Sequence, residues 1–89
     1  MGLFPLGRVV ATRRALKLLE ESGEDPRYYL SRHRSGDWGD LDTYDHKENE
    51  LSLEHGWRIL SSYPLGEKCI WIITEANRSY TTILLPEEY

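Results

Sequence analysis

The stretch Lys68-Cys-Ile-Trp-Ile-Ile-Thr-Glu75 decides the fold. Apolar, mostly β-branched and aromatic residues occupy both sides of its period-two alternation, which predicts a strand that is covered on both faces and lies inside a sheet. Similar segments precede and follow it, Trp57-Arg-Ile-Leu-Ser-Ser-Tyr63 and Tyr80-Thr-Thr-Ile-Leu-Leu85. Turn-forming residues separate the three segments at Pro64-Leu-Gly-Glu67 and at Ala76-Asn-Arg-Ser79. The pattern predicts three consecutive antiparallel strands in the C-terminal third of the chain.

A helix is expected ahead of this sheet, between residues 12 and 23. The hydroxyl group of Thr12 can cap a helix that runs from Arg13 to Ser22, and Gly23 is placed to end it. The preceding Arg8-Val-Val-Ala11 is short and β-branched, so it can add an edge strand to the sheet.

Two further helices follow. Asp25-Pro26 is a start signal for a helix that runs to about His33 or Arg34, because Asp caps well and Pro is favoured at the first helical position. A third, highly polar helix begins near Asp42-Thr43, ends before Gly56 and is expected on the surface. The residues of these two helices that can face a core are Tyr29, Leu30, His33, Tyr44, Leu51 and Leu53.

These elements predict a single α+β domain over residues 1–89. We expect an antiparallel sheet of three strands, or four if residues 8–11 join it, at the C-terminal end, packed against two to three short N-terminal helices. A chain of this size buries only about 60–68% of its unfolded surface. The three Trp and six Tyr residues are therefore expected to supply much of the core.

Composition and charge restrict the function. Cys69 is the single cysteine, which excludes an internal disulfide and favours a reducing, cytoplasmic setting. No stretch has the apolar length of a membrane span, so no membrane partner is expected. Residues 20–54 hold eleven of the fifteen acidic residues and only four basic ones, which disfavours general nucleic-acid binding and makes a protein the expected partner.

Metal and cofactor motifs are absent. His33, His46 and His55 are spread over the helices without a chelating spacing, so scattered surface histidines are the preferred interpretation. The glycine patterns of nucleotide-binding loops and nucleophile elbows are also missing. We expect neither a metal nor a cofactor.

The loop Gly36-Asp-Trp-Gly-Asp40 is the first candidate binding site, with Asp37, Trp38 and Asp40 as its residues. The two glycines permit a tight backbone that presents the indole ring either to the core or to a partner. Because the loop holds no other apolar side chain, an inward Trp38 that anchors it is the favoured alternative.

The second candidate site is the last hairpin, where Glu75, Arg78 and Thr82 cluster in sequence with Tyr80 and Thr81. A carboxylate, a guanidinium group and a hydroxyl could serve as base, phosphate clamp and orienting group in cleavage of a phosphodiester, if a histidine acted as the acid. In residue type this set resembles the Glu, Arg and His of barnase-like and RelE-like ribonucleases. The favoured alternative is a structural Glu–Arg pair across a turn.

Several segments together resemble a family of small uncharacterised bacterial proteins found near plasmid and mobile-element genes. They are residues 7–12, 35–40, Asn49-Glu50, 71–79 and 81–89. Members are sometimes labelled type I restriction endonuclease subunit M, but this chain has no Asn-Pro-Pro-aromatic motif and is too short for a methyl-donor domain.

The absence of catalytic motifs and the glycine-framed Trp38 loop beside an acidic helix favour an accessory or interaction protein without enzymatic activity. The resemblance implies an association with mobile elements or with restriction and modification. Two alternatives remain at this point. One is the metal-independent ribonuclease or toxin, and the other is an acidic mimic of nucleic acid built from residues 37–54.

Overall fold

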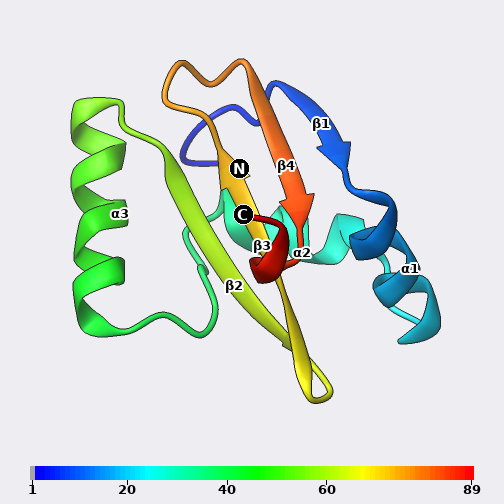
Figure 1. Ribbon diagram of the computed structural model, residues 1–89. Coiled ribbons are helices and arrows are strands. Elements are labelled where there is room, and N and C mark those ends of the chain that lie inside the picture. Colours follow the sequence, from blue (N-terminus) through cyan, green and yellow to red (C-terminus); the bar gives the residue numbers. More distant parts are fainter. Residues whose placement is uncertain (1) are drawn as a thin grey trace.

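A computed structural model describes residues 2–89 as four strands, three α-helices and a C-terminal 3₁₀ turn (Figure 1). In chain order these are β1 (Arg8–Ala11), α1 (Arg13–Glu21), α2 (Pro26–Arg34), α3 (Thr43–His55), β2 (Ile59–Leu65), β3 (Lys68–Thr74), β4 (Tyr80–Leu84) and η1 (Pro86–Glu88). The predicted α+β class is confirmed, and so are the three helices.

The four strands form one sheet in the order β1-β4-β3-β2. β3 lies inside the sheet, antiparallel to both β2 and β4, as its two apolar faces predict. β1 does join the sheet, but it pairs parallel to β4, so the expectation of a purely antiparallel sheet is wrong. Three helices and a hairpin separate β1 from β4, and a connection of that length allows the two strands to run in the same direction.

The helices begin where the capping residues predict. The side chain of Thr12 accepts from the Ala15 N–H at 3.1 Å, Asp25 accepts from Arg27 N–H at 2.9 Å, and Asp42 accepts from Asp45 N–H at 2.8 Å. These contacts satisfy amide groups that have no partner within the helix.

β2 is displaced from its predicted position by two residues at each end. It begins at Ile59 and continues through Pro64 to Leu65, so the turn before β3 is only Gly66-Glu67. Pro64 is tolerated because β2 is an edge strand, where a missing N–H group breaks no ladder hydrogen bond. Trp57 lies outside the strand and is 50% exposed.

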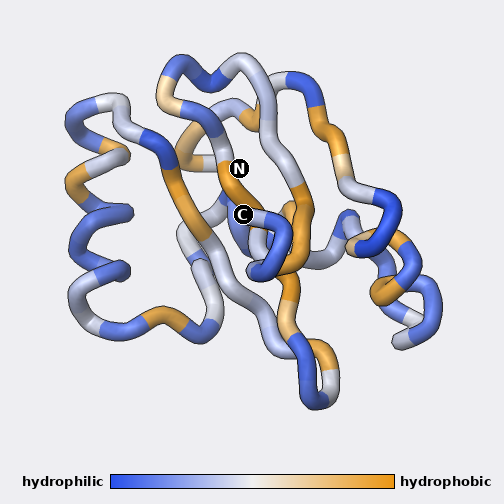
Figure 2. The backbone as a smooth tube through the Cα atoms, viewed as in Figure 1, coloured by the Kyte–Doolittle hydropathy of each residue, from blue (hydrophilic) through white to orange (hydrophobic). Residues whose placement is uncertain are grey.

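The two faces of the sheet differ in what covers them. In Figure 1, α2 lies behind the sheet, α1 lies beside it just past the end of β1, and η1 lies in front of it. The larger core is on the helix-covered face and comprises Ala15, Leu19, Tyr29, Tyr63, Leu65, Ile70, Ile72, Ile83 and Leu85. A second, smaller core contains Phe4, Trp38 and Ile59. Hydrophobic residues follow the strands while α3 is mostly hydrophilic (Figure 2).

Candidate functional site

α3 is attached to the edge of the sheet through a polar contact. The Asn49 side chain donates from Nδ2 to the Leu60 carbonyl oxygen at 2.6 Å and accepts from the Leu60 N–H at 3.1 Å. The amide group therefore takes the place of a neighbouring strand at Leu60. The buried residues of α3 are Asn49 and Ser52, whereas Tyr44 is 66% exposed, which corrects the expectation that Tyr44 reaches the core.

The loop before α3 closes the next position of the same edge. Ser62 N–H donates to the Trp38 carbonyl oxygen at 3.0 Å, and Asp40 N–H donates to the Ser62 carbonyl oxygen at 2.7 Å. Gly39, at φ 76°, is required between them because a Cβ atom there would collide with the Ser62 carbonyl group. The outward backbone groups of Leu60 and Ser62 are both paired, so this edge of the sheet is closed.

Arg78 fastens the C-terminal end of α3 to the β3–β4 turn. Its guanidinium group donates to the carbonyl oxygens of Trp57 at 2.6 Å, Ser52 at 3.1 Å and Glu75 at 3.2 Å. Burial of the group lowers the pKa of Arg78. The residue has a left-handed backbone at φ 61°, so the side-chain contacts offset a conformation that is costly for a non-glycine residue.

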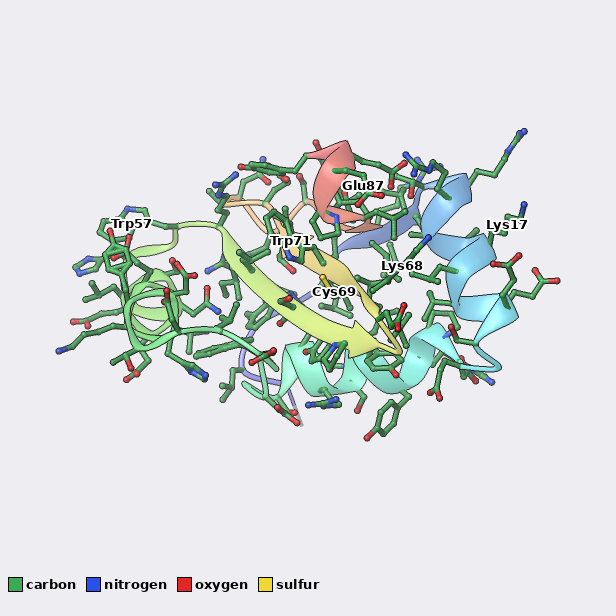
Figure 3. All side chains as sticks on the ribbon, turned by 60° about the horizontal axis from the view of Figure 1, so that its bottom comes forward. Lys17, Trp57, Lys68, Cys69, Trp71 and Glu87 are labelled. Atoms are coloured by element: carbon green, nitrogen blue, oxygen red, sulfur yellow. The ribbon has the colours of Figure 1, made fainter. Side chains whose placement is uncertain are left out.

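The Asn49 and Arg78 contacts lie on either side of a groove between α3 and β2, which has a volume of about 280 Å³. It is lined by Tyr44, Asp45, Glu48, Asn49, Ser52, Trp57, Arg58 and Leu60. Exposed aromatic rings belong to Tyr44 near the N-terminal end of α3 and to Trp57 just beyond its C-terminal end. In Figure 3, Trp57 lies beside α3 at one end of the molecule, far from Lys17 on α1.

The helix wall of the groove is acidic. Asp45 and Glu48 are three residues apart, so they lie on neighbouring positions of one helix face. Within residues 2–89 the three ion pairs are Arg14–Glu87, Arg27–Asp25 and Arg32–Asp37, so neither groove carboxylate has a cationic partner. The guanidinium carbon of Arg58, on the β2 side, lies 5.0 Å from the centre of the Tyr89 ring instead.

Of the predicted ribonuclease residues Glu75, Arg78 and Thr82, Arg78 is held by backbone carbonyl groups. Arg78 contacts the backbone carbonyl oxygen of Glu75, and its guanidinium group also lies 5.6 Å from the Phe4 ring. The strand alternation places Glu75 and Thr82 on one face of the sheet, and His33, which bonds Thr74, lies on the other face, in the core. The shallow pocket beside Glu75 is lined by Ala76, Asn77, Ser79 and Tyr80 as well, and contains neither a cation nor a histidine.

His33 is a structural residue rather than a surface one. The fully buried ring bonds Ser61 Oγ through Nδ1 at 2.5 Å and Thr74 Oγ1 through Nε2 at 2.8 Å. The chain of polar contacts continues from Thr74 Oγ1 to Thr81 Oγ1 at 2.7 Å and from there to the Leu6 carbonyl oxygen at 2.7 Å. Burial, with a smaller effect of the nearby Arg78 charge, lowers the pKa of His33 to about 3. The inward orientation predicted for α2 is confirmed, and the prediction of a surface histidine is wrong.

The loop of Asp37, Trp38 and Asp40 makes several contacts within the fold. The Trp38 side chain is 5% exposed in the second core, which confirms the inward anchor. Asp37 pairs with Arg32 at 2.7 Å, and this ion pair lowers the pKa of Asp37. Asp40 is exposed and contributes its backbone to the edge of β2. Trp38 is therefore not available as a contact residue for a partner.

The sequence alone did not identify Asn49, Trp57 or Arg58 as functional or positioning residues. The sequence pattern predicts a strand that includes Trp57 and Arg58, whereas both residues precede β2 in the structure. Asn49 and Ser52 lie one turn apart on a helix with few apolar residues. This spacing is the sequence signal that could have indicated the buried, polar face of α3.

Two classes of site are not found in the described part of the chain. Within residues 2–89, no three His, Cys, Asp or Glu side chains gather as metal ligands would. None of the helices over the same residues has the length and apolar character needed to cross a membrane.

Comparison of the chain with protein-family models, with curated proteins and with solved structures gives no significant match. The functional proposal therefore rests on the residues and their geometry.

Proposed function

We propose that this protein is an interaction module without enzymatic activity, which binds a basic segment of a partner protein in the groove between α3 and β2. The observation that carries the proposal is the combination of two unpaired carboxylates, Asp45 and Glu48, with two exposed aromatic rings, Tyr44 and Trp57, in one groove. Carboxylates attract Lys and Arg side chains, and an aromatic face binds the same cations over its ring.

The walls of the groove are held in place before any partner arrives. Asn49 fixes α3 to β2, and Arg78 holds the carbonyl group of Trp57. A groove that is already formed costs less conformational entropy on binding than one that must be assembled. The size of the groove suits one or two side chains of an extended segment rather than a small-molecule substrate.

The closed edge of β2 restricts how the segment can bind. Leu60 and Ser62 already have partners for their outward backbone groups, so the segment does not add as a strand there. Recognition is instead expected through side chains, with a Lys or Arg of the partner between the carboxylates and the Trp57 ring.

The ribonuclease alternative has no comparable support, because Arg78 is engaged by three carbonyl groups and His33 is buried. The cytoplasmic setting stays a prediction from composition. The association with mobile elements or restriction systems stays a prediction from the family resemblance.

A peptide titration tests the proposal. The probe is a synthetic decapeptide of alternating Lys and Gly, with a Glu-Gly decapeptide as the negative control, and amide chemical shifts report binding. The double variant Asp45→Asn/Glu48→Gln is expected to weaken Lys-peptide binding at least tenfold, which corresponds to about 1.4 kcal/mol. Trp57→Ala is expected to weaken it as well.

The matched control is Glu50→Gln/Glu54→Gln. It removes the same charge from α3 at two exposed residues that do not line the groove. The control is expected to retain binding within a factor of about two to three. Equal weakening by both double variants would mean that only the overall charge of α3 attracts the peptide, and the groove proposal would fail.

A further inference from the structure

β1 is the open edge of the sheet. The N–H group of Arg8 donates to the Ser79 carbonyl oxygen at 3.0 Å, and that of Thr12 donates to the Ile83 carbonyl oxygen at 2.9 Å. Because backbone groups alternate in direction along a strand, the even-numbered residues of β1 point theirs at β4. The N–H and C=O groups of Val9 and Ala11 therefore point away from the sheet, and neither N–H has a partner within residues 2–89.

The two edges of this sheet contrast in exposure. The β2 edge is closed by a side-chain amide, a loop and a proline, whereas β1 is flanked on its outer side by no other element in Figure 1. Val9 and Val10 are 43% and 39% exposed, which is high for apolar residues of a strand. An uncovered edge with β-branched residues is a template for pairing with another strand.

We infer that two copies of this chain pair through β1, antiparallel about a two-fold axis at Val10, to form a continuous eight-stranded sheet. In this register the outward groups of Val9 face those of Ala11 in the second copy, which gives four new backbone hydrogen bonds. The two Val10 side chains meet directly across the axis at the closely spaced, non-hydrogen-bonded position. Such a symmetric contact closes on itself and does not lead to a fibre.

Charge favours the antiparallel arrangement over a parallel one. Arg8 lies at the start of β1, whereas Thr12 at its end donates to the carboxylate of Glu88 at 2.7 Å. Antiparallel pairing places Arg8 of each copy opposite Thr12 and near Glu88 of the other, while parallel pairing in register would place the two Arg8 side chains side by side. A four-residue strand buries little surface, so we expect a weak dimer.

Sedimentation equilibrium from about 10 µM to about 1 mM tests the inference, since a weak dimer changes population over that range. Wild type is expected to shift from monomer to dimer. Val10→Lys and Val10→Glu should each weaken the dimer at least tenfold, because each places two like charges across the axis. An equimolar mixture of the two variants should form a mixed dimer again, since the charges are then opposite.

Leu51→Lys and Leu51→Glu provide the matched control, because Leu51 is a comparably exposed apolar residue on α3, at the far side of the sheet from β1. These variants should dimerise as wild type does. As a second measurement, exchange of the Val9 and Ala11 amide hydrogens should slow at high concentration. A wild-type monomer throughout the range, or dimers unaffected by both Val10 variants, would overturn the inference. Peptide binding in the α3–β2 groove is independent of either result.

Discussion

The side-chain amide of Asn49 pairs with both backbone groups of Leu60, donating at 2.6 Å and accepting at 3.1 Å. A single side chain thus closes the exposed edge of β2 and attaches a helix that has almost no apolar contact residues of its own. Polar groups that are buried and paired in this way are costly to leave unpaired.

Asn49→Leu should therefore destabilise the protein although it replaces a buried polar residue by an apolar one of similar size. Both backbone groups of Leu60 lose their partner, and we expect the free energy of unfolding to fall by about 1–3 kcal/mol in urea denaturation. Lys47→Leu, at an exposed site of the same helix, is the control and should change it by less than about 0.5 kcal/mol. Equal effects would show that the amide does not hold α3.

His33 predicts a loss of stability in acid. Its pKa is about 3 in the folded chain against an ordinary value of 6.5, so the unfolded chain binds one more proton between these two values. The stabilisation is complete above pH 6.5 and is lost as the pH falls toward 3, at about 1.4 kcal/mol for each pH unit. Asp25 and Asp37, whose ion pairs with arginine lower their pKa values, add to the loss only at more acidic pH.

Urea denaturation at pH 7, 6 and 5 measures this dependence. His33→Gln is expected to be less stable than wild type at pH 7 but to lose less stability between pH 7 and 5. If the free energy of unfolding of the His33 variant depended on pH as steeply as that of wild type, a group other than His33 would be responsible for the loss of stability in acid.

At position 78, in the β3–β4 turn, alanine is expected to destabilise the protein more than glycine. Arg78→Ala removes the contacts to three carbonyl groups and keeps a Cβ atom at φ 61°, whereas Arg78→Gly removes the same contacts but relieves the backbone. We expect Arg78→Ala to lower the free energy of unfolding by at least about 2 kcal/mol. Arg78→Gly should recover about 1 kcal/mol of that loss.

Thermal denaturation of both variants, with Arg13→Ala as an exposed arginine control, provides the comparison. An Arg78→Ala protein as stable as wild type would contradict the structural role and reopen a functional one for this guanidinium group.

Local signals explain why the helices could be predicted from the sequence. Thr12, Asp25 and Asp42 cap helices through contacts with residues two or three positions away, so their effect is visible in the chain itself. The interior position of β3 could also be predicted from the sequence, because a strand that is apolar on both faces has to be covered on both sides.

Contacts between distant residues explain what could not be predicted. The direction of β1 depends on its pairing with β4. The groove depends on Asn49 meeting Leu60, and the failure of Glu75 and Arg78 to form a site depends on the carbonyl groups of α3 that Arg78 reaches. A sequence shows residue types near each other in the chain, but these contacts join residues brought together only by the fold.

The pairing of β1 with β4 also sets the order in which the molecule can fold. Thr81 donates to the carbonyl oxygen of Leu6, 75 residues earlier in the chain, and within residues 2–89 β1 pairs with β4 alone. Contacts of such separation require closure of a long loop and slow the rate of folding. The β2–β3 hairpin can form from local contacts, whereas β1 cannot pair until β4 has formed. Val9 and Val10 therefore stay unpaired until β4 has formed.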